Sequence, residues 1–459
     1  MAGSYKYAII GSGAAAGIVA AKLSRTRDGI VVVEAGKHYT ARDFPMDQYN
    51  LGRLYWKSAL QFTADFGTNL TRGMAVGGSS VVYQALFDEF SEDVWERWRR
   101  KSGVPFFSSK EMSTHYRDVL GGFHTEIIPE ARQNENARIF TAGMSALGYR
   151  TRRLRRAQRN CRPEEGYNCI DCFGGCPIDS KESSLINGIA QAVDRGVELK
   201  SEFAVRTIRR GGGRFLINGR GSGGKEQFYA ENVVLAAGAL GSTEILLRSG
   251  YKRALPALGE AFWLHPTYYS FGLFPRIIDA HAGAFQSVAS DDPRLHAMGI
   301  KLESMAHPFV SLAMLLPLNV ITQEYLESPR NIGCVETALR PDAHGRITID
   351  IFGTCGAEYS PCRKDMERKE HGLEICAEIL RGQGARSVVH SKLASAVHLM
   401  GGCAMGTDAR KSVVNPSFEV HGFRNLYVVD SSLFVDAPGY NPSLSVMALA
   451  SRAADGIAA

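Results

Sequence analysis

The chain of 459 residues is 45% hydrophobic and 22% charged, and its formal net charge is +6. This length exceeds one ordinary hydrophobic core, so two domains are expected, and the composition is typical of a globular protein. The mild charge, without a basic surface interleaved with aromatic residues, argues against nucleic acid as a partner.

Signals for membrane insertion and secretion are lacking in the sequence. No stretch approaches the roughly 20 apolar residues that span a bilayer. Residues 1–7 lead straight into a strand, without a basic and then apolar leader. We therefore expect a cytoplasmic protein with no membrane span. The densest basic run, residues 150–159, is expected to be a solvated face, and an anionic substrate or an acidic partner is the alternative.

The N-terminal pattern predicts a β-α-β unit. Residues 5–10 and 30–33 are apolar runs typical of buried strands, and residues 18–23 between them favour a helix. The connecting segment, residues 11–17, is rich in glycine and alanine. Such a unit of about thirty residues usually begins an open, mostly parallel sheet.

Later segments show the same alternation of strands and helices, which is lost after about residue 255. A helix is expected over 183–197, a strand over 202–208, hairpin turns within 211–224, a strand over 232–238 and a helix over 242–248. Residues 255–390 instead show strand-like patterns at 309–316 and 346–352, which suit an antiparallel sheet with one face toward a ligand. We predict an α/β protein whose dinucleotide-binding domain comprises 1–90, 177–254 and 395–459. A second domain is inserted as 91–176 and 255–394.

The glycine-rich turn carries a dinucleotide-binding fingerprint. Gly11 permits a tight turn, Gly13 lets the backbone approach a pyrophosphate, and Ala16 keeps the helix close to the strand. Glu34 ends the second strand 21 residues after Gly13, where a carboxylate would bind a ribose hydroxyl. This acid argues against a 2′-phosphate, which leaves FAD or NAD.

Further motifs give the chain a family resemblance. They are Gly77-Gly78-Ser79-Ser80, the 232–244 segment, and the C-terminal patterns His398-x-x-Gly-x-Cys-x-Met-Gly and Asn441-Pro442. Together with the fingerprint they resemble the glucose-methanol-choline (GMC) oxidoreductases, although the inserted domain matches poorly. The resemblance implies a Rossmann-like FAD-binding domain of the GMC type with an inserted substrate-binding domain. The implied FAD-binding residues are Gly11, Ser12, Gly13, Ala15, Ala16, Glu34, Ala35, Gly77, Gly78, Ser79, Val205, Ala237, Asp430, Asn441 and Pro442.

The same resemblance implies a catalytic pair, His398 and Asn441. A neutral imidazole can take a hydroxyl proton at cellular pH while a hydride leaves for the flavin. An amide cannot be the base, but its NH₂ group can hold the developing alkoxide. The alternatives are a satisfied core histidine and a turn residue before Pro442. For Asp430 the alternative is a carboxylate that caps Ser431-Ser432.

Two statements about prosthetic groups follow. Residues 71–76 contain no histidine or cysteine that could attach the flavin, so we expect dissociable FAD. Cys161, Cys169, Cys172 and Cys176 crowd into sixteen residues, and the last three resemble half of a ferredoxin signature. An iron–sulfur cluster on Cys169, Cys172 and Cys176, a zinc ion, and plain or disulfide-capable thiols remain open, with plain thiols favoured.

We therefore expect an FAD-dependent dehydrogenase or oxidase that acts on the CH–OH group of a polar alcohol. A sugar, a polyol or a sugar-bearing natural product is the expected substrate, and the electron acceptor (oxygen, a quinone or a protein) is open. The alternative within the same fold is a lyase or decarboxylase that uses flavin without net alcohol oxidation.

Overall fold

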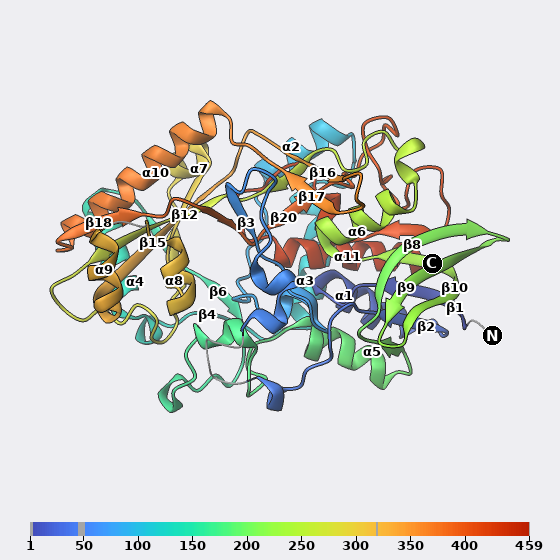
Figure 1. Cartoon of the computed structure of the whole chain (residues 1–459), viewed down its shortest axis with the longest axis horizontal. Coiled ribbons are helices and arrows are strands. Elements are labelled where there is room, and N and C mark those ends of the chain that lie inside the picture. Colours follow the sequence, from blue (N-terminus) through green and yellow to red (C-terminus); the bar gives the residue numbers. More distant parts are fainter. Residues whose placement is uncertain (1–2, 45–50, 318–319, 459) are drawn as a thin grey trace.

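The computed structural model describes residues 3–44, 51–317 and 320–458, and of 320–322 only the backbone. Two sheets dominate it (Figure 1). In that view the first sheet lies on the right, with both termini nearby, and the second lies on the left. Within the described residues no helix is long and apolar enough to cross a membrane.

The first sheet has seven strands in the order β7-β2-β1-β10-β9-β8, with β21 paired to β10. Its strands are β1 (Ser4–Ile10), β2 (Ile30–Val33), β7 (Glu198–Lys200), β8 (Ala204–Gly211), β9 (Arg214–Gly221), β10 (Gly224–Leu235) and β21 (Leu426–Val428). β1 lies parallel to β2 and β10, and α1 (Ala14–Leu23) connects β1 to β2. The predicted β-α-β unit is thus confirmed. The two hairpin turns within 211–224 are also present, with β9 between them.

Several helices surround this sheet and pack on its strands or on one another. They are α1, α2 (Glu92–Ser102), α3 (Ser109–Gly121), α5 (Ala190–Asp194), α6 (Gly238–Arg248) and α11 (Ser443–Ala458). α11 packs against α1 and α3, because its Ala- and Ser-rich sequence allows close helix approach. The expected helix at 183–197 is present as a π-helical turn, η8 (Leu185–Ile189), followed by α5.

The second sheet has eight strands and is mostly antiparallel, as predicted, in the order β3-β19-β12-β15-β14-β13-β5 with β18 paired to β12. Its strands are β3 (Thr68–Leu70), β5 (Thr151–Arg153), β12 (Thr267–Leu273), β13 (Val288–Ser290), β14 (Ile300–Ser304), β15 (Ile332–Leu339), β18 (Ser387–His390) and β19 (Ala394–Ala396). Helices α4 (Glu135–Ala146) and α10 (Arg363–Gly382) pack against one face, which leaves the other face for a ligand.

Three two-stranded ribbons and three short helices complete the fold. The ribbons pair β4 (Thr125–Ile127) with β6 (Arg155–Ala157), β11 (Phe262–Leu264) with β20 (Leu399–Gly401), and β16 (Arg346–Ile349) with β17 (Cys355–Glu358). The short helices are α7 (Pro293–Met298), α8 (Phe309–Leu315) and α9 (Val320–Glu327).

The prediction of a strand at 309–316 is wrong, because this segment forms helix α8 after Pro308. A short apolar run does not by itself distinguish a strand from a helix. The strand expected at 346–352 stops at Ile349 and turns at residues 350–354. There the Asp350 carboxylate accepts backbone hydrogen bonds from Phe352 and Thr354, so the chain reverses early.

The two-domain division stays a prediction, and the packing bears on its boundaries. α2 and α3, from the predicted insert, contribute Trp95, Trp98 and Met112 to the core of the first sheet. β3, from the predicted dinucleotide-binding segment, joins the second sheet beside β19. The sheet to which each element belongs therefore favours domain boundaries other than the predicted ones.

Candidate active site

One cavity of about 1030 Å³ is lined by the strand ends and loops of the first sheet and by one face of the second. This volume is above the range of ordinary small-ligand sites, so it leaves room for a dinucleotide and a substrate together. Among the predicted site residues, those that line it are Gly11, Ser12, Gly13, Ala15, Glu34, Ala35, Gly78, Ser79, Val205, Ala237, His398, Asp430, Asn441 and Pro442.

Ala16 and Gly77 were also predicted to contact the cofactor, but they do not line the cavity. Ala16 is fully buried in α1, where its small side chain lets the helix approach the sheet. The Gly77 backbone N–H donates a hydrogen bond to Ser12 Oγ (2.9 Å). Both residues therefore support the cavity wall from behind.

The fingerprint and the glycine-serine loop meet at the wall of the cavity. Gly11 has φ +103°, and a Cβ there would lie 2.4 Å from the carbonyl oxygen of Ala236. A Cβ on Gly78 would lie 2.8 Å from Gly13 Cα, whereas a Cβ on Gly13 would meet no protein atom within 4 Å. Two backbones thus touch at Gly78, and the space beside Gly13 is open for a ligand phosphate.

Glu34 is held in place from the protein side. Its carboxylate accepts hydrogen bonds from Ser12 N (3.1 Å), Ser12 Oγ (2.6 Å) and Gly36 N (2.8 Å). Burial nevertheless raises the pKa of Glu34. A further hydrogen bond, donated by a hydroxyl group of a ligand, would favour the charged form of this carboxyl group. This environment fits a ribose hydroxyl.

Asp430 lines the cavity in which we expect the cofactor, and it also caps Ser431-Ser432, which was the alternative role. Its Oδ1 accepts a hydrogen bond from Ser432 N (2.8 Å), so it caps the short helix η11 (Ser431–Leu433). Its Oδ2 accepts from Gly238 N (2.8 Å) and Ser242 Oγ (2.5 Å). The carboxylate therefore ties η11 to the start of α6 and also borders the cavity.

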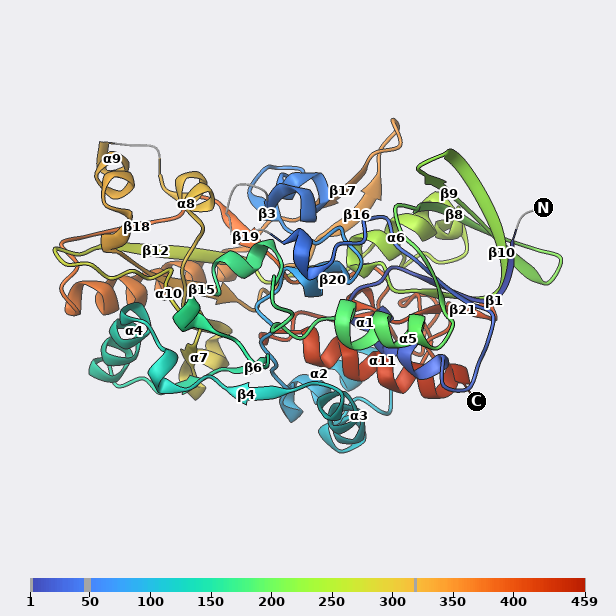
Figure 2. The same cartoon turned by 90° about the horizontal axis from the view of Figure 1, so that it is seen from below.

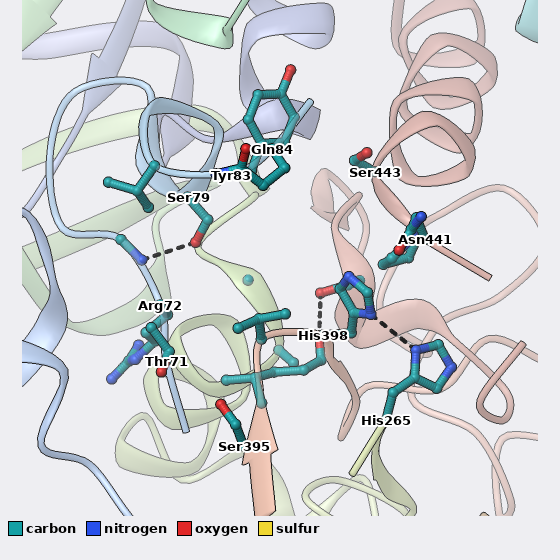
Figure 3. A pocket seen from close by; sticks show the side chains of 18 of the residues that line it. Thr71, Arg72, Ser79, Tyr83, Gln84, His265, Ser395, His398, Asn441 and Ser443 are labelled. Atoms are coloured by element: carbon teal, nitrogen blue, oxygen red, sulfur yellow. Dashed lines mark hydrogen bonds between the residues drawn. The ribbon is translucent and has the colours of Figure 1, made fainter. Parts of the chain in front are cut away.

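His398 lies between β19 and β20, and its ring contacts a second histidine that the sequence did not single out. The Nδ1 atoms of His398 and His265 are 3.0 Å apart, and His265 Nε2 accepts a hydrogen bond from Gly439 N (3.0 Å). Figure 3 shows His398 with Asn441 and His265 on one side and the loop carrying Ser79 on the other. Burial lowers the pKa of His398 to about 4, and burial together with His398 lowers that of His265 well below 6.5.

These contacts fix the tautomers of the neutral pair. Because the Gly439 N–H donates to Nε2 of His265, the proton of neutral His265 is on Nδ1. That proton is donated to Nδ1 of His398, so neutral His398 carries its own proton on Nε2. The resting pair thus presents an N–H to the cavity.

Asn441 is positioned by a buried carboxylate. Its Nδ2 donates to Asp88 Oδ2 (2.9 Å), which leaves its second N–H for another acceptor. Asp88 also contacts Arg152 (2.7 Å) and Lys301 (3.3 Å). Burial disfavours the charged form of Asp88, but the charges of Lys301 and Arg152 outweigh it and hold its pKa at about 2.

The free face of the second sheet carries what we call the polar wall, two rows of hydrogen-bonding side chains. One row follows β12, β15, β14, β13 and β5 and carries Tyr269, Glu336, Glu303 and Arg152, with Ala289 of β13 between the last two. The other follows β19, β12, β15 and β14 and carries Ser395, Thr267 and Lys301, with Ala338 of β15 between the last two. Gln286 joins the first row by donating from Nε2 to Glu303 Oε2 (2.6 Å). All eight side chains line the cavity.

Two carboxyl groups face each other directly in this wall, on paired strands. Burial and the charge of Glu303 raise the pKa of Glu336 well above its usual value, which favours its protonated form. Burial opposes the charge of Glu303, but Lys301, 2.6 Å away, lowers its pKa. With Asp88, two anions thus balance the two cations Lys301 and Arg152.

Sequence reasoning missed His265, Asp88 and the polar wall. No spacing marks His265, which follows β11 directly and precedes Pro266. The alternation in β14 gave a weak signal, since Lys301 and Glu303 stand two positions apart between apolar residues, and Glu336 is the one charged residue of the mostly apolar β15. In a sheet with one face covered by helices, such positions indicate the ligand face.

The cysteine-rich segment forms a small second cavity, lined by Cys161, Cys169, Cys172 and Cys176 with Arg156 and Lys181. Among the described residues all cysteines are free, and no group of three or more His, Cys, Asp or Glu is arranged to hold a metal ion. A hydrogen bond from Cys172 is the largest cause that lowers the pKa of Cys176 to about 6.

Comparisons with known proteins agree with this architecture. The GMC oxidoreductase family models match residues 10–267 and 329–450. An uncharacterized GMC-type oxidoreductase of Mycobacterium tuberculosis is 28% identical, over 97% of this chain and 75% of its own length. A long-chain-alcohol oxidase of Arabidopsis thaliana is 25% identical, over 96% and 66%.

A solved structure, pyridoxine 4-oxidase from "Mesorbium loti", superposes with a TM-score of 0.74 at 18% identity, covering 98% of both chains. This likeness supports the fold, a Rossmann-like FAD-binding architecture with a substrate domain. The matched family models span most of the sequence and include every predicted cofactor and catalytic position. The chain therefore belongs to the GMC oxidoreductase family and is an oxidoreductase that acts on CH–OH donors.

Proposed function

We propose that the protein oxidises the CH–OH group of an uncharged polar alcohol, a sugar, a polyol or a sugar-bearing natural product, with dissociable FAD. FAD bound along the fingerprint would accept the hydride at its N5 atom. The observation that carries the proposal is the polar wall, which offers many hydrogen-bonding groups and whose two cations are balanced by Glu303 and by the adjacent Asp88. Binding an apolar alcohol there would strand buried polar groups, at about 1–3 kcal/mol each.

His398 and Asn441 are the proposed partners of the substrate hydroxyl. Asn441 offers its second N–H to the substrate oxygen, and Asp88 keeps the amide oriented. In its resting tautomer His398 donates from Nε2. To take the hydroxyl proton there, the pair must exchange tautomers, so that His398 Nδ1–H donates to His265. That exchange loses the Gly439 hydrogen bond, at about 1–3 kcal/mol, which is small beside the barrier reductions that enzymes achieve.

The test is anaerobic flavin reduction by a panel of sugars, polyols, glycosides, and aromatic and aliphatic alcohols. At least one polar alcohol should bleach the flavin, and His398→Ala should keep FAD but slow bleaching at least about 10²-fold. Normal reduction by that variant would refute the role of His398. Failure of every alcohol would instead favour a lyase or decarboxylase.

Two finer features belong to the same proposal. The segment Thr71–Val76 offers no attachment residue, which supports dissociable FAD, and acid precipitation should release the flavin from the protein.

The free thiols support a cytoplasmic location. Oxygen consumption against reduction of a quinone distinguishes an oxidase from a dehydrogenase.

The cysteine-rich segment keeps its own alternative. Its four cysteines and two cationic side chains line one small cavity, but among the described residues the cysteines are not arranged to hold a metal ion, so an iron–sulfur cluster on Cys169, Cys172 and Cys176 would require the segment to rearrange. Plain thiols are the favoured interpretation. Stoichiometric iron and absorbance beyond the flavin bands after anaerobic purification would establish the cluster, and a pure flavin spectrum would exclude it.

A further inference from the structure

Four apolar side chains that line the cavity are exposed to solvent, in contrast to the polar wall. Val310 and Met314 of α8 stand at i and i+4, on one face of the helix, and both line the cavity although their side chains are 46% and 49% exposed. Val397, directly before His398, and Leu60 also line it and are each 56% exposed. We call these four residues the apolar rim.

The position of α8 places this rim on the substrate side. In Figures 1 and 2, α8 lies between α9 and the segment carrying β3, toward the middle of the molecule. Its opposite face is anchored, because Leu312 is 6% exposed and belongs to the core of the second sheet. The packing of Leu312 therefore holds the face of α8 that carries Val310 and Met314 at the cavity.

Exposed apolar groups that converge on one cavity from three chain segments usually mark a binding surface. The rim is continuous with the cavity that contains His398, so its occupant is expected to extend from the reacting alcohol. A ligand that contacts both the polar wall and the rim must be polar at one end and apolar at the other.

Resting on the proposed function, we propose that the substrate is an uncharged polyhydroxylated ring that carries an apolar substituent. The ring lies against the polar wall with one CH–OH between His398 and Asn441. The substituent lies against the apolar rim. The chemical class is thus a glycoside, or an equivalent polyol ether, with an alkyl or aryl group.

The experiment measures anaerobic flavin reduction by free glucose, galactose and xylose and by their methyl, butyl and hexyl β-glycosides. Each fully buried methylene contributes about fourfold in affinity, so partial burial at the rim predicts at least about a tenfold lower Kd for hexyl than for methyl glycosides. In Val310→Ser/Met314→Ser this difference should fall to about twofold or less. Met314→Gln alone should reduce it by about half on a logarithmic scale.

The matched control is Ile351→Ser/Phe352→Ser. These side chains are 94% and 86% exposed and do not line the cavity, so the chain-length effect should persist. Equal Kd values for methyl and hexyl glycosides, or the same loss in the control, would overturn the rim and leave alcohol oxidation standing. A chain-length-dependent change in flavin absorbance without reduction would support the rim and overturn the proposed oxidation.

Discussion

The two walls of the cavity bind by different means. The wall from the first sheet is made of backbone, since Gly11, Gly13 and Gly78 bring main chain to its surface. The wall from the second sheet is made of long side chains, with Glu303, Glu336 and Lys301 at its centre. Backbone amides are the same in every sequence, whereas side chains differ.

The first wall is therefore suited to a cofactor shared by many proteins, and the second to a substrate particular to this one. His398 and Asn441 stand where the two walls meet. Asn441 depends on Asp88, and Lys301 contributes to the low pKa of His398. The proposed catalytic pair thus depends on side chains of the second wall, and changes to each wall should have separable effects.

The largest effect should come from filling the space beside Gly13. Gly13→Val places a Cβ where no protein atom lies within 4 Å, and the residue has an extended backbone with a φ of −67°, which does not require glycine. The apoprotein should keep its unfolding free energy within about 0.5 kcal/mol. FAD affinity should fall about 100-fold through lost phosphate contacts, as measured by flavin fluorescence titration.

Gly11→Val is the control for this prediction. Its φ of +103° and its contact with Ala236 mean that it should destabilise the apoprotein as well as lose FAD. If Gly13→Val kept its flavin, the pyrophosphate would not lie beside this residue, and the assignment of the first wall would be wrong.

In the second wall, two carboxyl groups that look alike in sequence should respond differently. Glu303 is ionised and paired with Lys301, so Glu303→Gln weakens a buried ion pair and should cost about 3 kcal/mol of unfolding free energy. The raised pKa of Glu336 favours its protonated form, so Glu336→Gln should replace one neutral group by another of similar shape and cost less than about 1 kcal/mol. Urea unfolding of the two holoproteins measures both, and equal costs would contradict the charge assignment.

The first wall could be predicted from sequence because its chemistry is local. Gly11, Gly13 and Glu34 lie within one β-α-β unit, where strand, turn and helix fix their relative positions. His398 and Asn441 were singled out because the motifs that contain them resemble those of the GMC family. Their partners His265 and Asp88 come from distant segments, and only the folded chain reveals those contacts.

The second wall escaped prediction for a related reason. Glu303 and Glu336 become neighbours only through the register of β14 against β15, which no local pattern determines. Helix α8 was predicted as a strand because seven mostly apolar residues satisfy either periodicity. The polarity of the substrate stays a prediction, and the polar wall supports it with side chains that the sequence did not single out.

The smallest effect expected is a nearly flat pH profile. Burial, assisted by Lys301, holds the pKa of His398 at about 4, below the roughly 6.5 of an unfolded histidine. Between these values the unfolded chain binds more protons, so His398 lowers stability as the pH falls from 6.5 toward 4. Because the ring of His398 is mostly neutral above about pH 5, flavin reduction should change less than about twofold between pH 8 and 5.5 and fall only below about 4.5. Lys301→Met, which leaves Glu303 and Asp88 near the ring, should move this acid limb to higher pH. If flavin reduction by the unmodified protein instead fell near pH 6.5, the second wall would not lower the pKa of His398.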